Sequence, residues 1–333
     1  MASSIAYSPK EWEVWVIGEG TCGTTANAAS GMYQLDVDGI SMPSLNVTQS
    51  LSPRSSGGRT LKSKDFFQDN NLRVVEISLS GIFHDDVGHK GLFKNITSEA
   101  GENFTVPTGY SPEPLKYGQT SDVAAADFDT FTLVLKSPDP TDNTRNIEMS
   151  GCVVTNLTLS SDINSDGGQY KWSATIQTGS PCDFADNTDS GGTAYVNTDL
   201  FKLSSVTGVE IYNAANLALN SFTLTIDNPA VFIGNKLDTG GYEIINRGQE
   251  CSVTVDCQIK YDDDTKGFIN DFDTQTQVMA TDFMFQMAAA SAGGIIIRDG
   301  VFTNVAFSEG DVMMLDCSIK ALDNGAALLD LDF

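Results

Sequence analysis

One short acidic stretch has the residue types of a metal-binding loop. Residues 162–167 read Asp-Ile-Asn-Ser-Asp-Gly, so Asp162, Asn164 and Asp166 occupy the alternate positions that begin an oxygen-rich calcium loop. The bidentate glutamate that closes such a loop is missing, because its position is taken by Ser173. Asp, Asn and Gly also supply the backbone angles that a hairpin turn requires. We therefore interpret the stretch as a turn between strands and keep the three residues as weak metal-site candidates.

Both histidines of the chain lie in another polar segment, residues 84–89, beside two carboxylates. His84 and His89 with Asp85 and Asp86 have the side chains to bind a metal ion or to transfer protons. The segment opens a predicted helix over residues 85–98, where carboxylates at the start favour the helix dipole. The corresponding acidic stretch of the second half, residues 262–264, has no histidine. We favour a solvated helix start over a site.

Signals of enzymatic chemistry are otherwise missing from the sequence. A serine or cysteine nucleophile needs a base nearby, and these two histidines are the only ones in the chain. There is no nucleophile elbow, P-loop, dinucleotide-binding fingerprint or metalloprotease motif. We predict that the protein is not an enzyme and uses no cofactor.

The charge balance restricts the partners of the chain. The formal net charge is −25, with 44 acidic against 19 basic residues. Such a chain repels phosphate, which argues against tight binding to nucleic acid or to an anionic membrane, but not against DNA passing nearby. No apolar run reaches the roughly 18 residues of a membrane helix, and the N-terminus has no signal-peptide pattern. The six cysteines include no CxxC pair and predict reduced, buried thiols.

An internal repeat organises the chain. Residues 153–160 read Val-Val-Thr-Asn-Leu-Thr-Leu-Ser and residues 301–308 read Val-Phe-Thr-Asn-Val-Ala-Phe-Ser, an offset of 148 (301 − 153). Both stretches predict strands, with Val153, Leu157 and Leu159 on one face of the first. Other strand-like stretches recur in the same order in each half, which predicts two copies of one unit. These strands are predicted over residues 33–38, 45–48, 74–83, 131–135, 149–160, 170–176, 222–225, 251–261, 283–285 and 314–320.

A basic segment interrupts the first unit. Residues 50–71 are polar, and a loop of this length inside a compact domain is usually functional or disordered. Its basic cluster stands out in a strongly acidic chain. The cluster consists of Arg54, Arg59, Lys62 and Lys64.

The N-terminal residues predict an arm that contains a short strand. Trp12, Val14 and Val16 would share one face of this strand and Trp15 and Ile17 the other. Apolar side chains on both faces predict a segment that is covered on both sides, by a neighbouring subunit or by the chain's own body. Trp12 and Trp15 are the candidate docking residues.

The predicted fold class is mainly β. We expect two tandem domains of sandwich or barrel-like form, each with one short flanking helix. The expected boundaries are an arm over residues 1–28, a first domain over 29–178, a linker over 179–194, a second domain over 195–320 and a C-terminal tail over 321–333.

Several of these stretches together resemble a phage major tail tube protein of the long form, with a duplicated tube domain. The resemblance covers roughly residues 11–320 and includes the order of strands and helix with a long early loop. Its sequence stretches are Trp-Val-Ile-Gly-Glu-Gly-Thr-Cys-Gly-Thr at 15–24, Ser-Gly-Cys-Val-Val at 150–154, and Ser-Phe-Thr-Leu-Thr-Ile-Asp-Asn at 221–228.

The resemblance implies a structural virion protein that is assembled in the bacterial host cytoplasm. Three duplicated chains would form a pseudo-sixfold ring, and stacked rings would form a tube with an acidic lumen for DNA ejection. The partners would be other copies of the chain and the tail proteins at the tube ends, with DNA passing unbound and no membrane involved. The early loop with its basic cluster would contact the adjacent ring. The alternative from another class is a capsid decoration protein or an adhesin-type β-sandwich.

Overall fold

The computed structural model is mainly β, as the alternating residue pattern predicts. Among the residues that it describes, no helix has the length and apolar character to cross a membrane. The described residues are 8–19, 23, 25, 31–43, 48–51, 66–69, 74–96, 130–138, 146–184, 192–196, 200–212, 214, 216–234, 241–242, 244–247, 250–274, 285–289, 294–297, 299–308, 312–322 and 328–332.

The first half of the chain forms β1 to β9 and helix α1. Strand formation follows from the period of two, as in β6, where Val75, Ile77 and Leu79 are buried while Glu76 and Ser78 are exposed. The bounds are β1 (Glu13–Gly18), β2 (Tyr33–Leu35), β3 (Gly39–Ser41), β4 (Thr48–Leu51), β5 (Phe66–Asp69), β6 (Val75–Ile82), α1 (Val87–Ile96), β7 (Phe131–Lys136), β8 (Ile147–Asp162) and β9 (Lys171–Thr178).

The second half forms β10 to β19 and helix α2. Strand β14 has the clearest alternation, with Val253, Val255, Cys257 and Ile259 buried. The bounds are β10 (Val206–Ile211), β11 (Leu219–Asp227), β12 (Val231–Ile233), β13 (Ile244–Asn246), β14 (Ser252–Lys260), α2 (Gly267–Asp273), β15 (Phe285–Ala289), β16 (Gly294–Ile297), β17 (Gly300–Ser308), β18 (Met314–Ala321) and β19 (Asp330–Asp332).

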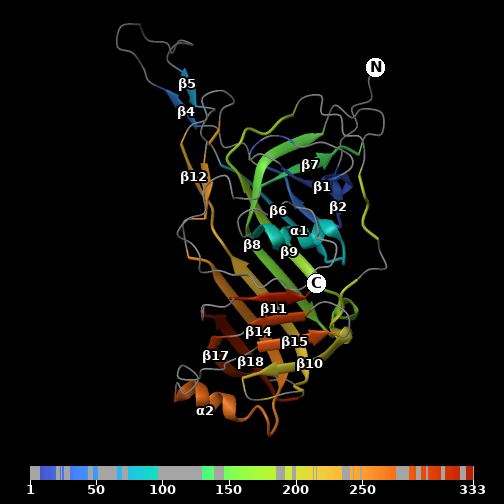
Figure 1. The fold of residues 1–333 in the computed structure, drawn as a ribbon, viewed down its shortest axis with the longest axis vertical. Coiled ribbons are helices and arrows are strands. Elements are labelled where there is room, and N and C mark those ends of the chain that lie inside the picture. Colours follow the sequence, from blue (N-terminus) through green and yellow to red (C-terminus); the bar gives the residue numbers. More distant parts are fainter. Residues whose placement is uncertain are drawn as a thin grey trace.

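One antiparallel sheet of eleven strands runs through both halves. Eight of its strands pair in the order β3-β6-β9-β8-β11-β14-β18-β17, which we call the long ladder. Strand β8 joins the halves because its residues 156–162 pair with β11. In Figure 1, β1, β2, β7 and α1 lie in the upper part and β11, β14 and α2 in the lower part, while β12 of the second half lies in the upper part.

The mainly β fold is confirmed, and the division into two tandem domains stays a prediction. Beyond the large sheet, β10, β15, β16 and β19 form a four-stranded sheet. Buried side chains of this smaller sheet, including Ile211 and Ile297, belong to the same core cluster as the long ladder. The described residues therefore share one main hydrophobic core instead of showing two separate ones.

The repeated Thr-Asn pair occurs at a β-bulge in each half. The register of β8 with β9 shifts between Val154 and Asn156, and that of β17 with β18 shifts between Phe302 and Asn304. The extra residue moves the following side chains to the other face. The predicted face of β8 is therefore wrong at one position: Val154, not Val153, joins Leu157 and Leu159 in the main core.

The N-terminal strand β1 is an interior strand of the sheet. It pairs with β7 on one side and β2 on the other. Its two faces are both covered, as predicted, and the cover comes from the chain's own body: Trp15 and Ile17 pack with Met32 and Val134. Trp12 packs against the main core and is partly buried. A role of either tryptophan in docking to another subunit stays a prediction.

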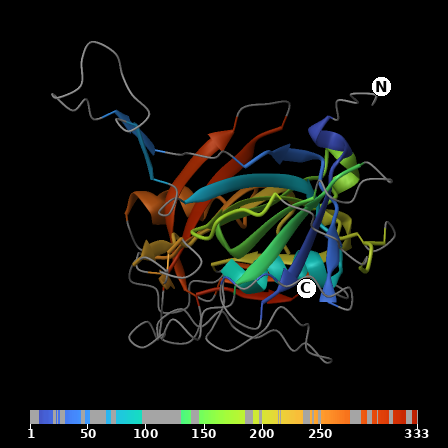
Figure 2. The same cartoon turned by 90° about the horizontal axis from the view of Figure 1, so that it is seen from above.

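Strands β4 and β5 lie near the two ends of the basic segment, residues 50–71, and pair with each other as a hairpin. The two strands pair from Thr48 with Asp69 to Leu51 with Phe66. Figures 1 and 2 show this hairpin projecting from the body of the protein. The candidates Arg54, Arg59, Lys62 and Lys64 lie outside the described residues.

The cysteines agree with the prediction of buried thiols where they are described. Cys152, Cys257 and Cys317 are free and buried, Cys251 is free and half-buried, and Cys182 is buried. Burial raises the pKa of Cys251 to about 12, so its reactive thiolate is scarce at neutral pH.

Candidate functional site

The long ladder has a solvent-facing side, which we call the polar face. Alternation places apolar side chains on the core side of each strand and small polar side chains on this one. It includes Ser78, Ser80, Ser173, Thr175, Thr158, Ser160, Thr223, Thr225, Thr254, Gln258, Ser318 and Ser308.

Charges on the polar face are sparse and mostly acidic. Five carboxylates and three lysines give a net charge of −2 (3 − 5). These residues are Glu76, Asp162, Asp227, Asp256, Asp316, Lys171, Lys260 and Lys320.

Polar groups on this face bind one another and so are held in place. Gln258 Nε2 donates to Ser308 Oγ at 3.1 Å and to Asp316 Oδ1 at 2.9 Å, and its Oε1 accepts from Asn220 Nδ2 at 2.6 Å. Ser318 Oγ donates to Asp256 Oδ1 at 2.5 Å. These bonds link neighbouring strands of the second half across the face. The surface is a fixed layer of hydroxyl and amide groups with few cations to hold a phosphate.

A buried carboxylate fastens β1 to β7 and β8. The side chain of Glu19 is 6% exposed. Its Oε2 accepts from Thr130 Oγ1 at 2.6 Å and from the Gly23 amide at 2.9 Å. Its Oε1 accepts from Thr132 Oγ1 at 2.8 Å and from the Gly151 amide at 2.8 Å. Four donors thus compensate the desolvation of one charge.

The guanidinium of Arg247 connects several elements where the β12–β13 hairpin meets the body. Arg247 Nη1 donates to the carbonyl of Val154 at 2.7 Å and to that of Asn228, and Nη2 donates to that of Asn95 at 3.2 Å. Asn95 lies in the last turn of α1, whose carbonyls attract positive charge. Arg247 therefore joins the helix, the β8 bulge and the end of β11.

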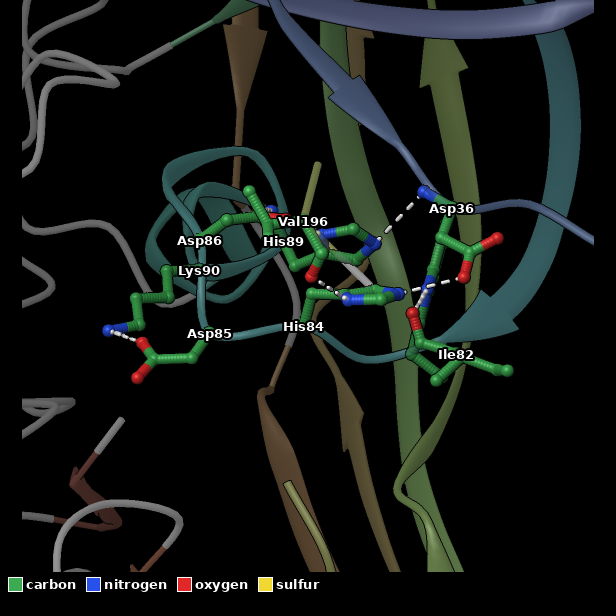
Figure 3. A network of polar contacts seen from close by, with 9 residues as sticks. Asp36, Ile82, His84, Asp85, Asp86, His89, Lys90 and Val196 are labelled. Carbon is green, nitrogen blue, oxygen red and sulfur yellow. Dashed lines mark hydrogen bonds and ion pairs between the residues drawn. The ribbon is translucent and has the colours of Figure 1, made fainter. Parts of the chain in front are cut away.

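The histidine segment forms a buried cluster, which corrects the prediction of a solvated helix start. His84 and His89 are 1% and 0% exposed, and their rings lie 5.2 Å apart. They are buried because β2 and the segment around Val196 pack over the start of α1, which a local sequence pattern does not reveal. Figure 3 shows both rings between Asp36 and the first turn of α1.

Both nitrogens of each ring have polar partners. His84 Nε2 lies 2.8 Å from Asp36 Oδ2, and its Nδ1 lies 3.2 Å from the Val196 carbonyl oxygen. His89 Nε2 accepts from the Asp36 amide at 3.1 Å, and its Nδ1 lies 2.8 Å from Asp86 Oδ1. The cluster therefore connects the start of α1 to β2 and to the segment around Val196.

The acidic loop is the turn that joins β8 to β9, the interpretation favoured from the sequence. Asp162 Oδ1 accepts from the Asn164 amide at 2.8 Å, and Asn164 Nδ2 donates to Asn220 Oδ1 at 2.9 Å. Asp166 pairs with Lys171, whose hydrogen bond lowers the pKa of the Asp166 carboxyl. The three candidate ligands therefore have three different partners. Asp166 and Gly167 take positive φ values of 50° and 69°, as a tight turn requires.

The predicted linker is attached to the first half where it is described. Thr193 exchanges backbone hydrogen bonds with the strand region of β2, accepting from Gln34 at 3.0 Å and donating to Met32 at 2.9 Å. Gly192 lies so close to Met32 and Trp15 that an added Cβ would be within 2.6 Å of a backbone oxygen. The connection between the halves is therefore packed against the protein here.

Sequence reasoning missed Glu19 and Arg247 as structural residues. Glu19 stands in a stretch of small residues, and Arg247 stands in a polar stretch, residues 246–250. The only sequence signal for either residue is a single charge next to apolar strands. Such a charge occurs at exposed positions as well as at buried ones, so it does not identify a structural residue.

Comparison with known protein families gives one match that covers nearly the whole chain. The family described as phage tail tube protein matches residues 14–321. No curated protein matches the chain.

Proposed function

Because the chain belongs to the phage tail tube protein family, a family of structural tail proteins, we propose that it is the ring-forming subunit of the tail tube. Three copies form each ring, and stacked rings form a conduit through which the genome is ejected. The chain assembles with itself and, at the tube ends, with other tail proteins. Assembly takes place in the host cytoplasm, and the product is part of the virion tail.

The strand pairing supports a ring of six similar units built from three chains. The long ladder divides into the quartets β3-β6-β9-β8 and β11-β14-β18-β17, which have the same order and direction. Each quartet ends in a strand with a bulge at its Thr-Asn pair. Thr155 Oγ1 donates to the Thr175 carbonyl at 3.2 Å, and Thr303 Oγ1 donates to the Ser318 carbonyl at 3.2 Å. One bulge repeated with the same hydrogen bond favours a duplicated tube domain.

Strand pairing also indicates which strand of the first unit corresponds to β11. The apolar pattern alone would match residues 222–225 with residues 45–48. By pairing, Ile40 opposes Leu79 of β6 as Phe222 opposes Cys257 of β14, so β3 corresponds to residues 221–223 of β11. A period of two is satisfied at many offsets, so the pattern alone did not determine the right one.

We assign the polar face to the lumen. The composition of this face is the observation that carries the proposal. A conduit for DNA needs a continuous wall that is wetted but does not bind phosphate. The long ladder offers hydroxyls, amides and a net charge of −2 from its charged residues, without a basic cluster. Repulsion acts over about 8–10 Å at physiological salt, which keeps the duplex off the wall.

Electron microscopy of the purified chain tests the proposed function. We expect rings with threefold symmetry and a pseudo-sixfold outline, stacked into tubes at high protein concentration. Particles that remain monomers at every salt concentration would contradict the proposal. A closed assembly without a central channel would contradict the lumen assignment alone.

Charge reversal of the basic cluster tests the contact between rings. We expect Arg59→Glu, Lys62→Glu and Lys64→Glu together to shorten tubes at least tenfold while single rings still form, because the cluster would no longer attract the acidic body of the next ring. The control carries the same charge change at Lys10, Lys202 and Lys266, which are exposed. Tube length is measured on micrographs, and equal lengths in the two triple variants would refute the contact.

A further inference from the structure

Two cysteine side chains face each other in the middle of the second quartet. Strand β14 pairs with β18, and Cys257 lies directly opposite Cys317. Both side chains belong to the main core, with exposed fractions of 5% and 1%. The two thiols form a hydrogen bond with each other, so their sulfur atoms are in contact.

The backbone pairing sets the distance between the two cysteines. Four residues further along the two strands, the Tyr261 amide donates to the carbonyl of Met313 at 3.3 Å, which makes these two residues a hydrogen-bonded pair. Such pairs recur at every second residue of an antiparallel ladder, and the register of β14 with β18 has no shift. Cys257 and Cys317 are therefore a hydrogen-bonded pair as well, with Cα atoms about 5.5 Å apart. A disulfide spans Cα separations of about 4.4–6.8 Å, so the bond needs no movement of the backbone.

The first unit shows that packing alone does not require cysteine at these positions. Cys257 corresponds to Leu79 of β6, which opposes Ala174 of β9. Leu79 and Ala174 are buried too, at 2% and 3% exposed. The same two places in the ladder are thus filled by an aliphatic pair in one unit and by a thiol pair in the other. What distinguishes the second unit is the chemistry of two adjacent sulfur atoms.

We propose that Cys257 and Cys317 are a modification site that closes to a cross-strand disulfide on contact with hydrogen peroxide and stays reduced in a reducing cytoplasm. The bond closes a loop that contains α2, β15, β16 and β17, which lie between the two cysteines in the chain. A disulfide restricts the unfolded chain, and a long loop increases this effect, so closure stabilises the second unit. Closure occurs within one chain and does not depend on ring formation, so this site goes beyond the proposed function.

The oxidation consumes one peroxide molecule for each thiol pair. One thiolate attacks a peroxide oxygen and the O–O bond breaks, and the departing hydroxide takes up a proton, which leaves water and a sulfenic acid. The second thiolate attacks the sulfenic sulfur, the S–O bond breaks and a second water leaves as the S–S bond forms. The two sulfur atoms give up two electrons, which reduce the peroxide.

The surroundings of the pair make the first of these steps slow. The hydrogen bond with the Cys317 thiol and burial hold the pKa of Cys257 well above its usual range, so the thiolate is scarce at neutral pH. The thiols therefore persist during folding and assembly, and long exposure or mildly alkaline pH favours the disulfide.

Peptide mapping of the full chain tests the bond. The folded protein is kept with hydrogen peroxide at mildly alkaline pH, and the remaining thiols are then alkylated in denaturant. In more than half of the chains, we expect a peptide that links Cys257 to Cys317, lighter by two hydrogen atoms than the reduced pair. Cys251 is the internal control, because it lies beside Arg247 and Glu250, outside the register of β14 with β18, and should not enter a disulfide. Alkylation of both cysteines, or equal yields of links to Cys251, would overturn the proposal.

A double variant separates the effect of the disulfide from that of core packing. Cys257→Leu with Cys317→Ala places the aliphatic pair of the first unit at the corresponding positions, so the chain should still fold. We expect oxidation to raise the Tm of the wild-type chain by about 5 °C and to leave that of the double variant unchanged. An equal shift in both proteins would assign the effect to oxidation elsewhere and overturn the stabilising role of the pair.

Discussion

Replacing Glu19 with alanine is expected to lower the free energy of unfolding by about 3–5 kcal/mol, because the loss leaves four donors, three of them buried, without their acceptor. Two of these donors are backbone amides, of Gly23 and Gly151, which cannot turn toward another partner. A loss of this size removes a large part of the about 5–15 kcal/mol that stabilises an ordinary domain. Urea denaturation of the single ring or monomer measures the effect.

The control for this prediction is Glu76→Ala. Glu76 is exposed on β6 and accepts one hydrogen bond, from Gln177 Nε2 at 2.8 Å. Its loss should change stability by no more than about 0.5 kcal/mol. Glu19→Gln should fall between the two, because the amide keeps one acceptor but directs an N–H at a donor. Equal stability of Glu19→Ala and Glu76→Ala would show that the buried carboxylate does not fasten the strands.

Replacing Arg247 with alanine is expected to cost about 2–3 kcal/mol, because three carbonyls from three elements lose a charged donor. Arg247→Lys should recover less than half, since an ammonium group cannot span carbonyls that the planar guanidinium reaches together. We expect the loss to be local as well. Amide hydrogen exchange should increase in the last turn of α1 and at the end of β11, and less in β14.

Lys320→Ala serves as the matched control for Arg247. Its side chain is 40% exposed and its ammonium lies 3.6 Å from Glu250 Oε1, an exposed pair worth about 0–1 kcal/mol. If Arg247→Ala is no more destabilising than Lys320→Ala, or if exchange increases uniformly, the guanidinium is not a junction between helix and sheet.

Local pattern determined the strands that could be predicted from the sequence. The predicted strand over residues 251–261 is β14, Ser252–Lys260, because a sheet with one solvated face imposes a period of two. The helix predicted over 85–98 is α1, Val87–Ile96, for the corresponding reason. These periodicities depend on neighbours a few residues away, so one sequence is enough to read them.

The parts that could not be predicted depend on residues far apart in the chain. Leu224 pairs with Leu159 across the junction, and nothing in either strand specifies the other. The bulge at Thr155 places Val153 on the opposite face from Leu157 and Leu159. The residue types of β8 do not show that a bulge is present. His84 and His89 looked solvated because their acidic neighbours are local, whereas the elements that bury them are 48 and 112 residues from His84.

The junction of β8 with β11 also has a consequence for synthesis on the ribosome. The first quartet is complete once β9 has emerged, but residues 156–162 of β8 wait for a partner that ends at Asp227, 65 residues (227 − 162) later. At about 5–20 residues per second this wait lasts about 3–13 s, during which an open strand edge faces other nascent chains. Translation speed between these strands would then govern how much of the newly made protein pairs with its own second half and how much with another chain.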